Sequence, residues 1–246
     1  MLAIIGGSGL TQLSTLEISR REVVRTPYGE PSGAVTFGAL ADRPVVFLAR
    51  HGYGHTIPPH QVNYRANIWA LKHVKATAIV SVASVGGIRE DFGPGALVVP
   101  NQIIDYTWGR RSTFFEGPEE PVHHIDFTHP YDEPLRQRIL EASAGIGEPM
   151  YDGGVYAATQ GPRLETAAEV NRLERDGAEL VGMTGMPEAS LARELGVPYA
   201  AINVVANYAA GRGASETGIQ FSTIEVVLHE AMMRVRRVLE EVCRRS

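Results

Sequence analysis

The sequence predicts a single α/β domain over residues 1–246, with a central mixed β-sheet flanked by helices. Short apolar runs that suit buried strands alternate along the chain with segments of helical periodicity. No linker, internal repeat or low-complexity block divides the 246 residues. The composition, 44% hydrophobic and 21% charged, is that of an ordinary globular domain.

The first part of the chain predicts strands over residues 2–5, 34–40 and 44–49. Only a short turn separates the last two, which indicates a hairpin. Apolar residues at helical spacing predict a helix over 62–74. Residues 77–84 are nearly all apolar and often β-branched, which is typical of a central strand covered on both faces.

The second part alternates in the same way. Strands are expected over 96–100, 103–106, 180–183 and 198–205, and helices over 133–144, 165–175, 187–195 and about 223–242. The sequence Ser222-Thr223-Ile224-Glu225 has the form of a capping box for the last helix. Residues 107–132 are rich in Gly, Pro, His and aromatic residues and predict a long loop, which in a compact domain is usually functional.

The charge and cysteine content exclude several classes of protein. A net charge of −5 argues against a nucleic-acid partner. No run approaches ~20 apolar residues, so no membrane span is expected. The single cysteine, Cys243, cannot form an internal disulfide, which fits a cytoplasmic location. The N-terminus has no basic stretch and predicts a first strand rather than a signal peptide.

The residues directly after the strands suggest one anion-binding cleft. Arg50 and His51 follow the apolar strand 44–49, and guanidinium groups bind oxyanions through paired donors. Ser8, within a Gly6–Gly9 turn, adds a hydroxyl beside backbone N–H groups, although this turn is equally compatible with a simple tight turn. In α/β sheets such strand ends meet at one edge, where ligands bind.

Further candidate residues have ordinary explanations when each is taken alone. Thr184 precedes Pro187 and a predicted helix, where phosphate binds well but where many helices simply begin. Glu165 fits a first-turn carboxylate favoured by the helix dipole. Asn207, just past the strand 198–205, fits a turn residue. The histidines lack metal-ligand spacing, so no metal site is expected.

Taken in order, these segments resemble the trimeric purine nucleoside phosphorylases, most closely their methylthioadenosine phosphorylase branch. The resemblance covers nearly the whole chain. Its most specific parts are Leu48–Gly52, His55–Pro58, Val62–Lys72, Gly161–Arg163, Met183-Thr184 and Pro187-Glu188. The resemblance implies an α/β fold of the nucleoside phosphorylase type, no metal or organic cofactor, and inorganic phosphate as co-substrate. It also implies a homotrimer acting in purine salvage.

The resemblance also implies roles for individual residues. Phosphate-binding positions fall on Ser8, Arg50, His51 and Thr184, helped by the backbone around Ala83-Ser84. Met183 matches a methionine that packs against the ribose. His124 matches a loop histidine that reaches a neighbouring subunit's 5′ pocket. The base-binding segment is Asn207-Tyr208-Ala209, and Asn207 and His51 are the candidate catalytic residues.

Two departures from the adenine-specific branch concern the base. That branch carries Asp-Tyr-Asp or a similar sequence where this chain has Asn207, Tyr208 and Ala209. Asn207 offers an amide donor for O6 and a carbonyl acceptor for a protonated N7. Glu165 stands where a small residue is common, and its carboxylate suits the N1–H that hypoxanthine has and adenine lacks. Both positions predict a 6-oxopurine.

The expected reaction is phosphorolysis of S-methyl-5′-thioinosine to hypoxanthine and 5-methylthioribose 1-phosphate. Ile219, Val226 and Val227 are the candidates for an apolar 5′ pocket. The alternatives are a general inosine/guanosine phosphorylase, with a polar 5′ pocket, and a methylthioadenosine phosphorylase. A hydrolytic nucleosidase and a non-catalytic nucleoside-binding protein are further alternatives, but neither needs phosphate-binding residues.

Overall fold

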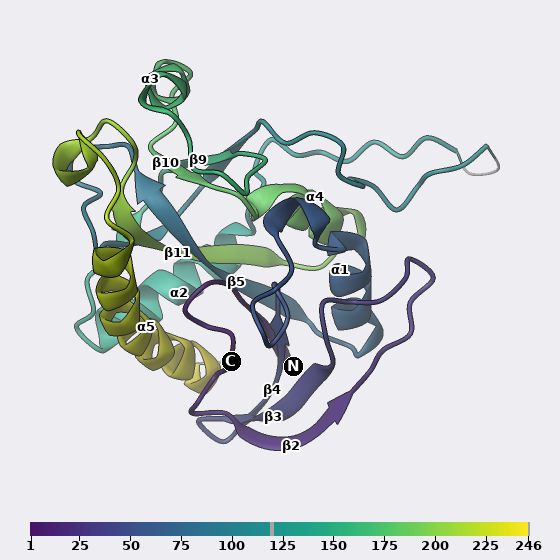
Figure 1. The fold of residues 1–246 in the computed structure, drawn as a ribbon. Coiled ribbons are helices and arrows are strands. Elements are labelled where there is room, and N and C mark those ends of the chain that lie inside the picture. Colours follow the sequence, from purple (N-terminus) through teal and green to yellow (C-terminus); the bar gives the residue numbers. More distant parts are fainter. Residues whose placement is uncertain (119–120, 246) are drawn as a thin grey trace.

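The computed structural model describes residues 1–118 and 121–245. The chain forms one mixed sheet with helices on both faces (Figure 1). Its strands are β1 (Leu2–Gly6), β2 (Glu17–Glu22), β3 (Val35–Leu40), β4 (Arg43–Ala49), β5 (Ala78–Gly87), β6 (Leu97–Val99), β7 (Gln102–Asp105), β8 (Tyr151–Asp152), β9 (Val155–Ala158), β10 (Leu180–Gly182) and β11 (Tyr199–Tyr208). Its helices are α1 (Tyr64–His73), α2 (Glu133–Gly145), α3 (Ala167–Arg175), α4 (Gly185–Glu194) and α5 (Phe221–Arg244), with 3₁₀ turns η1 (Pro59–Gln61) and η2 (Gly213–Ser215).

The central strand β5 pairs with a single strand along most of one edge and with two different strands along the other edge. β11 pairs with β5 in parallel along most of its length. On the opposite edge, β1 pairs with residues 78–81 and β10 pairs with residues 86–87. In the described part of the chain no strand pairs with residues 82–85 on that edge. The sheet is therefore split there, at the carboxyl ends of β1 and β4, and the split leaves backbone groups available for a site.

Two helix pairs cover the sheet. α1 packs against α4 on one face, and α2 packs against α5 on the other (Figure 1). α5 is amphipathic and buries one apolar stripe, from Leu228 to Cys243, against β11 and α2. α3 lies at the end of the sheet beside β9 and β10 and covers a smaller apolar cluster. None of the described helices is long and apolar enough to cross a membrane.

The predicted class and most elements are confirmed. The β3–β4 hairpin forms as expected, and both residues of its turn, Ala41 and Asp42, have positive φ. The long loop after β7 carries no helix or strand among its described residues. In Figure 1 it extends away from the body of the molecule.

Several local predictions are wrong. The sequence does not predict β2 and β8, which are fully exposed and lack an apolar pattern, or β9, which is apolar and mostly buried but only four residues long. α5 begins at Phe221, so Ser222–Glu225 lies inside the helix and forms no capping box. The capping box of this chain is at α3 instead, between Thr166 and Glu169. Glu165 therefore precedes the helix and is not a first-turn residue.

Candidate functional site

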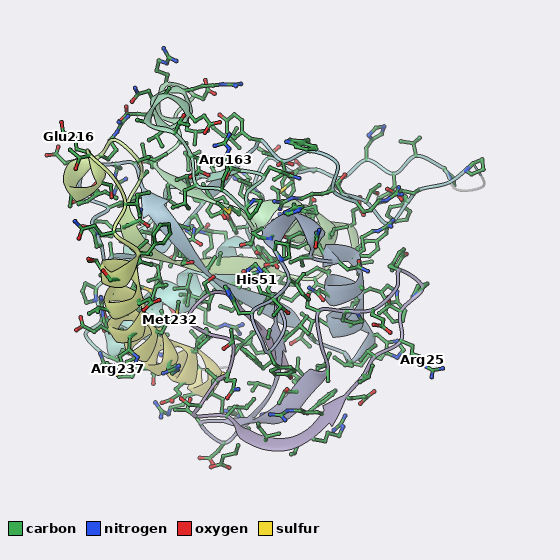
Figure 2. The ribbon with its side chains drawn as sticks, viewed as in Figure 1. Arg25, His51, Arg163, Glu216, Met232 and Arg237 are labelled. Atoms are coloured by element: carbon green, nitrogen blue, oxygen red, sulfur yellow. The ribbon has the colours of Figure 1, made fainter. Side chains whose placement is uncertain are left out.

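A cavity of about 530 Å³ opens where the sheet splits. It is lined by residues that follow β1, β4, β10 and β11 and by residues 83–86 of β5, which confirms that the strand ends converge. Its lining includes the candidate residues Ser8, Arg50, His51, Ala83, Ser84, Glu165, Met183, Thr184, Asn207, Ala209 and Ile219. In Figure 2 His51 lies near the centre of the molecule, whereas Arg25, Arg237 and Glu216 lie at its periphery.

Arg50 is fully buried and paired within the chain. Its Nε and Nη2 donate to the two carboxylate oxygens of Glu188 at 2.8 and 2.9 Å. Nη2 also donates to Ser81 Oγ, and Nη1 donates to the carbonyl oxygen of Val82 at the split in the sheet. Four of the five guanidinium N–H groups are thus used. Arg50 therefore cannot form the expected bidentate hydrogen bonds with an anion. One Nη1–H remains to donate to a ligand.

The Arg50–Glu188 pair is charged despite its burial. Burial alone would raise the pKa of Glu188, but the charge and hydrogen bonds of Arg50 hold that pKa below its ordinary value. Burial likewise opposes the charged form of Arg50, and Glu188 holds the pKa of the guanidinium above its ordinary value. This corner of the cavity therefore combines a fixed positive charge with its own counter-ion.

His51 presents an acceptor nitrogen. Its Nδ1 lies 2.8 Å from the carbonyl oxygen of Ile57. Since a carbonyl only accepts, Nδ1 carries the hydrogen, and in the neutral ring Nε2 has the lone pair. Burial, with the nearby charge of Arg50, lowers the pKa of His51 to about 4. At neutral pH this ring accepts a hydrogen bond and carries no charge.

Two hydroxyl groups lie at the same end of the cavity. Ser8 Oγ lies 2.9 Å from Nε2 of His55, an exposed residue whose φ is positive. Thr184 is buried and directly precedes α4, and its side chain does not cap that helix. The Ser8 hydroxyl can donate to an oxyanion when Nε2 of His55 carries the ring hydrogen, and the Thr184 hydroxyl lies on the cavity wall.

The start of α4 differs from the expected helix N-terminus. Met186 and Pro187 have non-helical backbone angles, so regular helix begins only after them. The backbone N–H groups of Thr184 and Gly185 both point to the hydroxyl of Tyr156, at 3.2 and 3.4 Å. These amides are occupied within the chain, so the dipole-assisted phosphate site expected here does not form. Only the side chain of Thr184 remains for an anion.

Glu165 is half-buried on another wall of the cavity. One of its carboxylate oxygens, Oε1, accepts a hydrogen bond of 2.6 Å from the hydroxyl of Thr159. Thr159 is fixed in turn, because its backbone N–H donates to the carbonyl oxygen of Gly182. The carboxylate is held in one orientation, and its second oxygen is left to accept from a ligand.

Asn207 reaches the cavity through a β-bulge. The pairing of β11 with β5 shifts between Val205 and Asn207, and such bulges redirect side chains next to active sites. Asn207 Nδ2 donates to the carbonyl oxygen of Tyr208 at 2.6 Å, which leaves one amide N–H and Oδ1 for a ligand. Ala209 is buried beside it and adds no polar group.

Tyr208 does not belong to the cavity lining. Its hydroxyl donates to the carbonyl oxygen of Glu90, and its ring lies close to Gly93 and Gly213. In a strand, successive side chains point to opposite faces, so Tyr208 faces away from the side that Asn207 and Ala209 share. The expectation that Tyr208 contacts the substrate is therefore corrected.

One wall of the cavity is apolar and comes from the start of α5. Ile219 lines it as expected, together with Phe221, Ile224 and Leu228. Val226 is 60% exposed, and neither it nor Val227 lines the cavity. These two candidates are corrected: Ile224 and Leu228, four residues apart, share the face of α5 that turns to the cavity, and Val226 lies about 200° around the helix from Ile224.

His124 is exposed in the long loop and does not line this chain's cavity. Within the described residues no cluster of three or more His, Cys, Asp or Glu side chains suits a metal ion.

Sequence reasoning missed two residues. Glu188 was identified only as part of a motif, although its carboxylate fixes Arg50. Arg110 was not singled out, although it donates to backbone carbonyls beside the cavity. Neither could be found from spacing, because their partners lie far away along the chain.

Comparisons with known proteins show that the chain is similar to a group of enzymes. A family model described as the phosphorylase superfamily matches residues 1–244. A probable S-methyl-5′-thioinosine phosphorylase from Pseudomonas syringae is 55% identical over 240 residues, which cover 98% of this chain and 97% of that protein. A 6-oxopurine nucleoside phosphorylase from Pyrococcus furiosus is 46% identical, covering 85% of this chain and 80% of that one.

Among solved structures, methylthioadenosine phosphorylase from Schistosoma mansoni in complex with adenine has a similar fold. The TM-score is 0.94 at 33% identity, and the match covers 99% of this chain and 90% of that chain.

Proposed function

The chain belongs to the phosphorylase superfamily, and we propose that it cleaves S-methyl-5′-thioinosine with inorganic phosphate. The products are hypoxanthine and 5-methylthioribose 1-phosphate, as expected for a pentosyltransferase of purine salvage. One observation carries the proposal. A single cavity is lined by a carboxylate and an amide that suit a 6-oxopurine, by phosphate-binding candidates, and by an apolar wall. The name of the 55%-identical relative supports the same substrate.

The base end suits hypoxanthine. The free oxygen of Glu165 would accept from N1–H, while Thr159 holds the other oxygen. The Asn207 carbonyl would accept from N7–H, and its remaining amide N–H would donate to O6. Ala209 supplies no acceptor for a 6-amino group. Each group of the site thus has a complementary group on a 6-oxopurine.

The phosphate end combines hydroxyls, one guanidinium N–H and a neutral imidazole. Ser8, Thr184 and the free Nη1–H of Arg50 would donate to phosphate oxygens, together with backbone N–H groups near Ala83-Ser84. Nε2 of His51 would accept from a protonated phosphate oxygen, because Nδ1 carries the ring hydrogen. Phosphate is thus bound beside the sugar without a metal or organic cofactor.

The chemistry follows from these contacts. A phosphate oxygen forms a bond to C1′ while the bond from C1′ to the purine nitrogen breaks, and the electron pair goes to the base. Positive charge grows on the sugar, which Met183 backs, and the phosphate anion stabilises it. Negative charge grows on the purine, where the hydrogen bond from Asn207 becomes stronger, and N7 takes up a proton from the solvent.

The apolar wall of Ile219, Phe221, Ile224 and Leu228 supports a 5′-methylthio group rather than a 5′-hydroxyl. A general 6-oxopurine nucleoside phosphorylase is the second candidate, since the Pyrococcus relative carries that name. Methylthioadenosine phosphorylase, the name of the similar Schistosoma structure, would require Asn207 and Glu165 to accept adenine.

A substrate panel tests the proposal. Inosine, adenosine, methylthioinosine and methylthioadenosine are each assayed for base release with and without phosphate. Methylthioinosine with phosphate should have the highest kcat/KM. Release of base without phosphate would identify a nucleosidase, and no release with any nucleoside would support a non-catalytic binding protein.

We further propose a cytoplasmic homotrimer. The long loop that carries His124 projects from the body of the chain, which suits a contribution to a neighbouring subunit's 5′ pocket (Figure 1). The free thiol of Cys243 suits a reducing compartment. Light scattering tests the assembly, and a fully active monomer would contradict it.

A further inference from the structure

Arg110 lies at the base of the long loop and is half-buried against the site. Its Nη1 donates to the carbonyl oxygens of Met183 and Met186 at 2.7 and 2.6 Å. Its Nη2 donates to the carbonyl oxygens of Thr159 and Gln160 at 3.2 and 2.9 Å. Nε donates to the side-chain oxygen of Gln160 at 3.2 Å. Nη1 also donates to the hydroxyl of Tyr64, at the start of α1, at 3.2 Å. One guanidinium thus joins the two segments that carry these carbonyls to each other and to α1.

These two segments carry different parts of the site. The connection from β9 to α3 carries Glu165, whose carboxylate is held by the hydroxyl of Thr159. Arg110 holds the carbonyl of the same Thr159. The connection from β10 to α4 carries Met183 and Thr184, both of which line the cavity. Arg110 therefore fixes the distance between the base carboxylate and the residues at the sugar and phosphate.

We propose that Arg110 is a positioning residue for phosphorolysis, which sets the base-binding segment relative to the sugar-binding segment. The inference rests on the proposed function, because the two segments are assigned to base and sugar there. Reacting groups must be aligned closely, and a misplacement of about 1 Å can cost about 10²-fold in rate. Arg110 does not line the cavity, so its effect acts through Thr159 and Met183.

Only arginine suits this place. The planar guanidinium holds five N–H groups in fixed directions. Its Nη1 can therefore donate to one segment while its Nη2 donates to the other. A lysine ammonium is a point charge and cannot reach both pairs of carbonyls at once. The hydrogen-bonding partners of Arg110 described above are carbonyl, amide and hydroxyl oxygens, not carboxylates. The residue therefore aligns backbone dipoles and does not serve as a simple ion-pair partner.

The test compares Arg110→Ala and Arg110→Lys with the wild type, using the nucleoside that the wild type cleaves best. Arg110→Ala should lower kcat/KM by about 10²-fold, with the larger share in kcat. Arg110→Lys should recover only part of this loss. Millimolar guanidinium chloride should raise the kcat of Arg110→Ala and leave that of the wild type unchanged, because the free cation can occupy the vacated place.

Two arginines provide matched controls. Arg111→Ala removes the next residue, whose side chain is 73% exposed and, among the described residues, bonds Glu116 alone. Arg136→Ala removes a buried arginine that donates to the carbonyls of Val99 and Pro100 and pairs with Glu133 and Asp152, none of which lines the cavity. Both should retain wild-type kcat/KM per folded molecule, although Arg136→Ala should lower the melting temperature.

Three results would overturn the inference. They are a kcat/KM of Arg110→Ala within about twofold of the wild type, an equal loss in Arg136→Ala, or no response to guanidinium. A wild type that cleaves no nucleoside would instead contradict the proposed function. In that case calorimetry with hypoxanthine still tests Arg110, since Arg110→Ala should bind the base more weakly than Arg136→Ala does.

Discussion

The carboxylate of Glu188 holds the guanidinium of Arg50 through two hydrogen bonds of 2.8 and 2.9 Å, and both side chains are completely buried. Glu188 also accepts from the hydroxyls of Ser81 and Tyr199, each at 2.8 Å. The pair links the end of β4 to α4 at the part of the cavity wall that Arg50 lines. It gives the phosphate end a fixed positive group whose charge is already balanced by the protein.

Glu188→Gln should destabilise the fold. The substitution keeps the shape but leaves the Arg50 charge buried without its counter-ion, which costs roughly 3–5 kcal/mol of unfolding free energy. Urea unfolding measures the change. The double variant Arg50→Met/Glu188→Leu should be less destabilised than Glu188→Gln, because it leaves no unpaired charge. A Glu188→Gln protein within about 1 kcal/mol of the wild type would contradict a charged pair.

Arg50→Lys should weaken phosphate use. Lysine keeps a charge opposite Glu188 but cannot also reach Ser81, Val82 and a ligand as the guanidinium does. Losing one charged hydrogen bond to phosphate, worth about 1.5–3 kcal/mol, should raise the phosphate KM by about 10- to 10²-fold. Kinetics at varied phosphate measure this. An unchanged phosphate KM and kcat/KM would remove Arg50 from the phosphate site.

Because of His51, the free energy of unfolding should be smaller in mild acid than at neutral pH. Its pKa is about 4 in the folded chain and 6.5 when unperturbed, so between these values the unfolded chain binds a proton that the folded chain does not. Stability therefore falls as pH drops from about 6.5 toward 4, by up to about 3 kcal/mol. Urea unfolding at pH 7.5 and pH 5 should show a smaller difference for His51→Gln than for the wild type. The exposed His229→Gln should behave as the wild type does.

The parts of the site that follow strands could be predicted from the sequence. Apolar strands and the polar residues directly after them, such as Arg50 and Asn207, mark the sheet edge where ligands bind. What could not be predicted is which donors remain free. Arg50 uses two of its donors on Glu188, 138 positions away, and two more on Ser81 and Val82, and the backbone amides of Thr184 and Gly185 donate to Tyr156. Such pairings depend on packing and not on local pattern.

The apolar wall shows the same limit. Ile219 lines the cavity as predicted, whereas Ile224 and Leu228 line it in place of Val226 and Val227. Ile224 and Leu228 are four residues apart and share one face of α5, and Val226 lies about 200° around the helix from Ile224. Which face turns to the cavity depends on how α5 packs against the sheet. The character of the wall was therefore predictable, and its members were not.

Ile224→Ser should reduce the preference for a 5′-methylthio group. Ile224 lines the cavity. Without its apolar surface, the binding free energy of a buried methylthio group should be weaker by about 1–3 kcal/mol. The kcat/KM for methylthioinosine should fall by about 10- to 10²-fold, whereas that for inosine should change little. Val226→Ser is the matched control, because Val226 is 60% exposed. It should leave the ratio of the two kcat/KM values unchanged. Equal losses with both nucleosides would show that this wall does not contact the 5′ group.

Asn207 and Glu165 should together select 6-oxopurines over 6-aminopurines. With adenine, N1 is an acceptor facing the Glu165 carboxylate, and the 6-amino group meets the remaining N–H of Asn207 with no acceptor at Ala209. Each mismatched buried group costs about 1–3 kcal/mol, so the wild type should favour methylthioinosine over methylthioadenosine by roughly 10²–10⁴ in kcat/KM. The double variant Asn207→Asp/Ala209→Asp should narrow this ratio by restoring acceptors, and adding Glu165→Ser should narrow it further. Thr159→Val, which frees the Glu165 carboxylate to turn without removing it, should lower kcat/KM for methylthioinosine less than Glu165→Ser does. Equal kcat/KM values for the two nucleosides with the wild type would refute this assignment of the base site.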